Sequence, residues 1–306
     1  MKRIVIVFLS LLPAIVCQAK KADLKLRLEP GKEYKQVMHS NVNVVQNING
    51  MEMDIEMIVD GSCTYRVKEV KGSNYLIDVW YDSLSLGMQF PQAKVVFSSE
   101  KDDELDILSR VLSSMKNKAF EIIMSDKGKV LEVNNITLLF ESLFGQFPDI
   151  PEDQKAQVRD QLIQAYGEKA FRGNIEIVTA LFPRKKVAPG DKWIIETKLE
   201  SGMEANVISE YEYLGQEEGF YRFHGESKLQ TADKDAYIES NGIPIKYDLS
   251  GSMKSDIKVD KDSGWIIEAS ITQELQGDAY ISANPNVTED MKVPMKMKNV
   301  MRITDR

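Results

Sequence analysis

The stretch VNVVQNINGMEMDIEMIV, from Val42 to Val59, decides the fold class. At its centre, Asn49 and Gly50 form a two-residue turn that tolerates positive φ at both positions and matches the twist of paired strands. Such a turn pairs apolar residues on one face: Ile48 with Met51, Val44 with Ile55 and Val42 with Met57. Only Gln46, opposite Met53, departs from the apolar face. The stretch therefore predicts a long antiparallel hairpin with one apolar side.

Strand signals continue on both sides of this hairpin. Alternating apolar and polar residues recur over 24–98 and again from Val187 to the last residues of the chain. Helical spacing of apolar residues appears instead at about 103–118 and in segments of 136–182, where DDELDILSRVLSSM and PEDQKAQVRDQLIQAY begin with acids or proline. The pattern predicts a mainly β protein with a central helical piece.

Two motifs occur twice in the same order. EPGKEYKQ (29–36) resembles APGDKWII (188–195), and SDKGKVLEV (125–133) resembles KDSGWIIEA (261–269). The first motif opens each strand-rich block, and the Asp-x-Gly hairpin comes later in each block. This preserved order favours a duplicated unit, although two unrelated tight turns would also contain Asp and Gly.

The fold class that follows is mainly β (α+β), with two similar antiparallel β-rich halves and a central helical insertion. We expect a first half over 20–135, an insertion over 136–184 and a second half over 185–306, together forming one compact unit. The sequence leaves open whether the halves form a sandwich or a half-open barrel.

The first 19 residues have the layout of a secretory signal peptide. Lys2 and Arg3 precede an apolar run that is shorter than the roughly 20 residues needed to span a bilayer, and Ala19 suits cleavage. Lipid attachment at Cys17 is an alternative, although Val16 is unusual before a lipidated cysteine. Either process predicts export to the periplasm or cell envelope, and no other stretch is apolar enough to span a membrane.

Charge and cysteine content argue against a nucleic-acid-binding protein and against a fold stabilised by disulfides. The net charge is −8, and loss of Lys2 and Arg3 would make it −10, so the surface repels phosphates and binding of nucleic acid is not expected. Cys63 would then be the only thiol, and the fold would depend on its apolar core without a disulfide.

Reactive groups do not form a recognisable motif. The two histidines, His39 and His224, lie in predicted strands away from other metal ligands, so we expect no metal and no cofactor. Glu132 and Glu268 hold equivalent places in the repeated hairpins and are the one acid pair that the repeat singles out. A solvated strand face explains them better than a pair of catalytic carboxylates.

Methionines and tryptophans provide the candidate ligand-binding residues. Thioether side chains adapt their shape to variable apolar partners, and methionines line one face of the first hairpin and of MKVPMKMKN (291–299). Most such stripes are simply core. The residues predicted to bind an apolar ligand are Met53, Met57, Trp80, Trp193, Trp265, Met295 and Met297.

Several motifs resemble those of an uncharacterised family of secreted β-rich proteins from Gram-negative envelopes. They are Leu28, Gly31 and Tyr34 in an L-x-x-G-x-x-Y entry, FPRKKVAPGDKW (182–193), and the late Asp-x-Gly hairpin. The similarity covers most of 24–306 and rests on turn and core residues. The resemblance implies the fold and implies no activity.

Three functions are compatible with these observations. The first is non-enzymatic binding of an apolar or amphipathic, lipid-like ligand. The second is a structural or interaction module with a fully packed core, whose envelope partner the sequence does not identify. The third and least favoured is a carboxylate hydrolase. A cavity, a solid core or a cleft with facing acids would distinguish them.

Overall fold

The computed structural model describes residues 21–306 apart from 102, 104, 201–202, 241–242, 284–286 and 288. The predicted signal peptide, with Cys17, lies outside the described residues. Within them, no helix combines the length and apolar character needed to cross a membrane.

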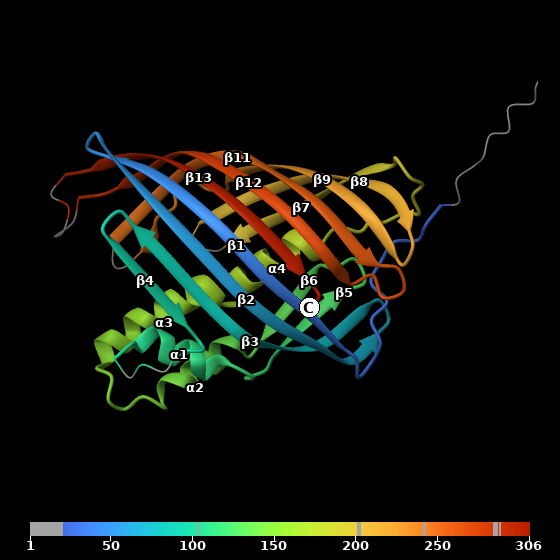
Figure 1. Cartoon of the computed structure of the whole chain (residues 1–306), viewed down its shortest axis with the longest axis horizontal. Coiled ribbons are helices and arrows are strands. Elements are labelled where there is room, and N and C mark those ends of the chain that lie inside the picture. Colours follow the sequence, from blue (N-terminus) through green and yellow to red (C-terminus); the bar gives the residue numbers. More distant parts are fainter. Residues whose placement is uncertain are drawn as a thin grey trace, which may run out of the picture.

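The strands form one antiparallel sheet that curls into a half-open barrel (Figure 1). Along the sheet the order is β6-β5-β3-β2-β1-β13-β12-β11-β9-β8-β7, and the short strands β4 and β10 pair with β3 and β11. Of the two architectures that the sequence left open, the structure is therefore the half-open barrel and not the sandwich. The strands are β1 (Glu33–Ile48), β2 (Met51–Lys71), β3 (Asn74–Phe90), β4 (Ala93–Ser98), β5 (Phe120–Ser125), β6 (Val130–Asn134), β7 (Lys192–Glu200), β8 (Glu204–Glu217), β9 (Phe220–Thr231), β10 (Ile238–Ser240), β11 (Ile243–Asp260), β12 (Ile266–Ile281) and β13 (Met291–Thr304).

The register of the first hairpin confirms the prediction from sequence. β1 pairs with β2 in the predicted register, which runs from Ile48 opposite Met51 through Val42 opposite Met57. Asn49 and Gly50 have φ of 52° and 84°, as a two-residue hairpin turn between right-twisted strands requires.

The two halves of the chain use the same strand order. β1-β2-β3-β5-β6 in the first half corresponds to β7-β8-β9-β11-β12 in the second, and the pairing of β1 with β13 joins the halves into one sheet. The turns containing Gly128 and Gly264 therefore occupy corresponding places, between β5 and β6 and between β11 and β12. This correspondence agrees with the duplicated unit that the repeated motifs favour.

The described residues contain four helices. α1 (Ile107–Met115) lies within the first half, before β5, whereas α2 (Ile136–Phe144), α3 (Glu152–Tyr166) and α4 (Glu168–Thr179) lie between β6 and β7. α1 packs on β3 and β4, and α2 packs on β5. α4 contacts both edge strands, β6 and β7, and so bridges the gap in the barrel. The Glu176 carboxylate accepts a hydrogen bond of 2.7 Å from the backbone N–H of Val130, and the Thr179 hydroxyl donates one of 2.7 Å to the carbonyl of Gly128.

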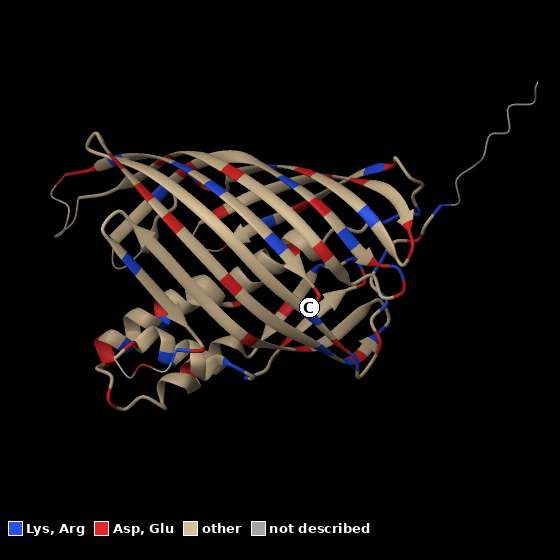
Figure 2. Cartoon of the chain, viewed as in Figure 1, with Lys and Arg blue, Asp and Glu red and all other residues tan. Residues whose placement is uncertain are grey.

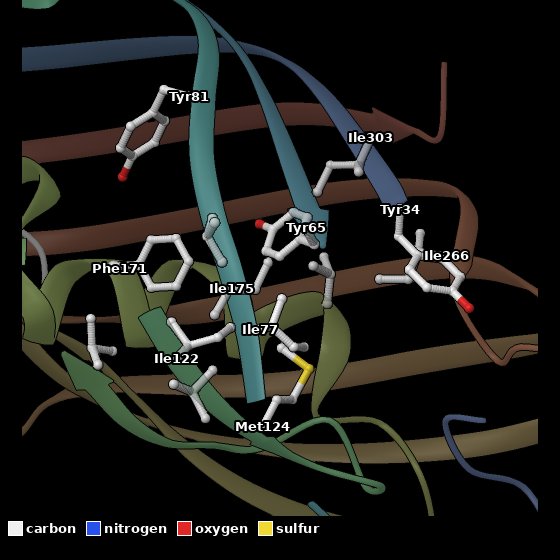
Figure 3. Packing of buried hydrophobic residues seen from close by; sticks show 14 of the residues in the cluster. Tyr34, Tyr65, Ile77, Tyr81, Ile122, Met124, Phe171, Ile175, Ile266 and Ile303 are labelled. Atoms are coloured by element: carbon white, nitrogen blue, oxygen red, sulfur yellow. The ribbon is translucent and has the colours of Figure 1, made fainter. Parts of the chain in front are cut away.

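One end of the barrel, here called the closed end, is filled by residues 22–28. Leu24, Leu26 and Leu28 are buried there. The backbone N–H of Leu26 donates to Asp126 at 2.8 Å, and that of Arg27 donates to Ser263 at 2.7 Å, so this segment joins the two corresponding turns. Figure 3 shows the neighbouring core, in which Tyr65, Ile77 and Phe171 from strands and α4 meet.

Candidate functional site: the open inner face

The opposite end, which contains the Asn49–Gly50 turn, is called the open end. The side of the sheet that carries the buried core is its inner face. Along β1, alternate residues from Tyr34 to Val44 face inward, and Tyr34 belongs to the core. Residues directly opposite one another on paired strands share a face, so the register identifies every inward position near the open end.

Three rows of inward-facing residues cross the sheet near the open end. The first of these rows contains Met53, Gln46, Met295, Gly277 and Leu249. The second contains Ile55, Val44, Met297, Leu275, Gly251, Leu229 and Val207. The third contains Met88, Met57, Val42, Asn299, Gln273, Met253, Ser227 and Ser209.

Five of the six methionines of these rows are only partly covered. Met53 is 37% exposed, and Met57, Met88, Met295 and Met297 are half-buried. Met253 is buried, as are almost all inward residues of the closed end. The sheet thus brings together four methionines that lie far apart in the sequence, on β2 and β13. They form a continuous apolar surface with part of its area still open to solvent, which we call the methionine face.

The third row also contains neutral polar groups that sequence reasoning missed. Gln273 is 7% exposed and faces inward from β12, beside Asn299 of β13. The Ser40 hydroxyl donates a hydrogen bond of 2.7 Å to the Asn299 side-chain oxygen. In ASITQEL (269–275), every second residue is apolar except Gln273, which stands between Ile271 and Leu275 in this alternation. This interruption is the sequence signal that could have revealed an inward polar residue.

The three predicted tryptophans lie away from the methionine face. Trp265 is buried and donates through Nε1 to the Lys35 carbonyl at 2.9 Å, with its ring centroid 5.0 Å from that of Tyr65. Trp193 donates to the Leu181 carbonyl at 2.9 Å. Trp80 lies on the outer face, where it donates to the Asp82 carboxylate at 3.1 Å.

The charged residues of the barrel wall lie mainly on the outer face. Figure 2 shows Lys and Arg interleaved with Asp and Glu along the strands. His39 contacts Asp60 at 2.6 Å and His224 contacts Asp256 at 2.8 Å, each across a strand pair. Over the described ranges, no group of three or more His, Cys, Asp or Glu side chains could hold a metal ion.

The acid pair singled out by the repeat is not brought together. Glu268 lies on β12 and pairs with Lys258 and Arg302, at 2.8 and 2.9 Å. These cations hold the pKa of Glu268 below its usual value. Glu132 is exposed on edge strand β6, and five strands separate the two acids in the sheet order. These two carboxylates do not face a common cleft.

Cys63 and the surface grooves offer other positions for chemistry. Burial raises the pKa of the Cys63 thiol to about 12, so the thiol stays protonated and is a poor nucleophile.

One groove of about 530 Å³ lies at the closed end beside Tyr34 and Trp265. Another, of about 480 Å³, is lined by Tyr237, Tyr280 and charged side chains at the open rim. Both grooves are polar as well as aromatic, unlike the methionine face.

Comparisons with solved structures give distant likenesses. A lipovitellin structure concerned with lipid–protein interactions has a TM-score of 0.49 at 8% identity. The match covers 92% of this chain and 25% of that one, so this chain spans about a quarter of its length. An outer membrane channel from Pseudomonas putida F1 has a TM-score of 0.25 at 8% identity, with 92% and 97% of the two chains covered.

Comparisons of sequence give a family and no individual relative. No curated protein matches the chain. The model of a family of unknown function, DUF6263, matches residues 72–266. The matched region begins at the β2–β3 turn and ends at the start of β12, so it includes α1 to α4 and parts of both halves.

Proposed function

We propose that this chain, which belongs to the family of unknown function DUF6263, is a non-enzymatic binding protein that holds an apolar or amphipathic ligand on the methionine face. One observation carries the proposal: the four methionines of the methionine face remain partly exposed at the open end, while residues 22–28 and α4 help fill the rest of the interior. Covering apolar surface of this kind releases roughly 25 cal/mol per Å².

The chemistry of the methionine face supports an adaptable apolar ligand. Unbranched thioether chains change rotamer at little cost, so a face of four methionines can fit ligands of varied shape. None of the inward residues in the three rows carries a charge. The site therefore consists of methionines, aliphatic residues and a few neutral polar side chains of β1, β2, β12 and β13.

A pair of neighbouring substitutions on β2 tests the binding site. Met57→Lys places a charge on the inner face, whereas Ile58→Lys makes the same kind of change at the next residue, which points outward and is 39% exposed. We expect Met57→Lys to weaken binding of a hydrophobic fluorescent probe at least about tenfold, because an apolar ligand would desolvate the ammonium group. We expect Ile58→Lys to leave binding unchanged; equal effects of both substitutions would contradict the proposal.

Native mass spectrometry of protein purified from its own host, followed by lipid extraction, tests for a natural ligand. We expect a co-purifying apolar molecule that Met57→Lys fails to retain.

The proposal also includes export to the periplasm or cell envelope, which the layout of residues 1–19 supports. Fractionation and N-terminal sequencing of the mature chain would distinguish cleavage after Ala19 from lipidation at Cys17.

An interaction module is the second candidate, and an apolar patch on the outer face favours it. Ile194 on β7 and Ile208 on β8 point outward and are 64% and 49% exposed. Both lie at the sheet edge formed by β7, where another envelope protein could pack. Cross-linking in the host with and without Ile194→Asp tests this candidate, which predicts a cross-link that the substitution removes.

A further inference from the structure

The inner face contains an amide that has no partner among the described residues. Gln273 is more than nine-tenths buried, and within the described residues its side chain makes no hydrogen bond. Its amide atoms are not among the fully buried unpaired ones, so they keep contact with solvent. Because Gln273 projects inward from β12 between Asn299 and Met253, a ligand group that hydrogen-bonds to it has to reach it from the interior of the open end.

Asn299 is held so that its donors remain available. The Ser40 hydroxyl, which is buried, donates to the Asn299 side-chain oxygen at 2.7 Å. This bond uses the acceptor of the amide and leaves its NH₂ group, for which the described structure shows no acceptor. Gln273 and Asn299 lie directly opposite each other on β12 and β13, so their amides form one polar spot in the third row.

The surroundings of this polar spot are apolar and uncharged. Met57 and Val42 continue the third row on one side, and Met297 of the second row lies two residues from Asn299 along β13. No inward residue of the three rows could neutralise an ionised ligand. A charged head group would therefore lose its hydration without compensation, while an uncharged polar group would gain hydrogen bonds.

We propose that Gln273 and Asn299 bind the uncharged hydrogen-bonding group of an amphipathic ligand, such as the ester or hydroxyl of a neutral lipid, while its hydrocarbon chain covers the methionine face. This assignment rests on the proposed function and specifies its ligand class. The Gln273 amide can donate and accept, and the Asn299 NH₂ group donates, which suits a group that combines carbonyl and hydroxyl oxygens.

Four probes with the same chain length test the assignment: monoolein, oleyl alcohol, oleate and octadecene. We expect monoolein to bind the full-length protein about tenfold more tightly than octadecene, as two added hydrogen bonds would produce, and oleate to bind more weakly than monoolein. Gln273→Met, which keeps the side-chain length, should remove the preference for monoolein and retain binding of octadecene. Gln276→Met, on the outward side of the same strand, should change neither affinity.

The outcomes separate the two proposals. Binding of octadecene with no preference for monoolein, or tighter binding of oleate, would overturn the assignment of Gln273 and Asn299 and leave the apolar site in place. Failure of every probe to bind the unsubstituted protein would overturn the proposed function as well. The comparison of probes needs no variant, so it decides the question even if Gln273→Met fails to fold.

Discussion

At the scale of single residues, Gly128 shows how strongly one position can depend on its neighbours. Its φ of 77° lies in the left-handed region, and a Cβ atom built there would overlap the carbonyl oxygen of Thr179. Gly264 holds the corresponding place in the other half, with a φ of 72°, and its Cβ would overlap the carbonyl oxygen of Lys25. Both turns thus need glycine for backbone conformation and for close packing.

Substitution of Gly128 should therefore be far more damaging than substitution of a glycine that only makes a turn. We expect Gly128→Ala to destabilise the protein by about 3 kcal/mol or more in urea unfolding, since strain adds to displacement of α4. Gly72→Ala is the matched control, because Gly72 has a φ of 61° and open space around it, and should cost only about 1–2 kcal/mol. Equal losses would show that the contact with Thr179 is unimportant.

At the scale of elements, α4 packs against both edge strands of the curled sheet and so bridges the gap in the half-open barrel. It connects β6 and β7, which have no further strand partner on their outer sides among the described residues. The buried Glu176 lies at this junction. Burial raises the pKa of Glu176, and the hydrogen bond from Val130 opposes that rise. The junction therefore contains an acid whose charged form is disfavoured by the fold.

This raised pKa predicts a pH dependence of stability. Because the pKa of Glu176 is higher in the folded than in the unfolded protein, the folded protein binds more protons. The contribution of Glu176 to the free energy of unfolding is therefore complete below its usual pKa, and it is lost as pH rises through the raised pKa. Glu176→Gln keeps an acceptor for Val130 and removes the titration. We expect the stability of Glu176→Gln relative to the unsubstituted protein to increase between about pH 4 and pH 7. A constant difference across this range, measured by urea unfolding, would contradict the argument.

At the scale of the whole molecule, the two halves share one sheet and one segment, residues 22–28, which fills the closed end and is here called the plug. The pairing of β1 with β13 makes the sheet continuous, and residues 22–28 bond to Asp126 in one half and Ser263 in the other. Leu26 is 2% exposed at the centre of this plug. Disturbing the plug should therefore affect both halves together.

We expect Leu26→Ala to cost roughly 2–5 kcal/mol through loss of buried side-chain volume. Unfolding should remain a single transition by tryptophan fluorescence and by far-ultraviolet circular dichroism, as one cooperative unit requires. Leu105→Ala provides the control at a fully solvated position and should change stability by less than about 0.5 kcal/mol. Two separate transitions would show that the halves fold independently.

The sequence by itself determined the local and repeated features. Asn49 and Gly50 specified a two-residue turn, which fixed the β1–β2 register because a shift by one residue would expose every apolar side chain. Alternation predicted the strands, and helical spacing placed the helices in the correct segments. Both Asp-x-Gly turns lie at the predicted hairpins.

Only the tertiary structure decided which faces meet. Strand alternation gives two sides without saying which is concave, so Trp80 could not be assigned to the outer face or Met57 to the inner face. The pairing of β1 with β13 joins residues more than 200 positions apart, and no local signal encodes it. That pairing places Met53 and Met57 on one side of β1 and Met295 and Met297 on the other, all on the inner face. It also places Asn299 beside Ser40, because long-range register is selected by burial of the whole face at once.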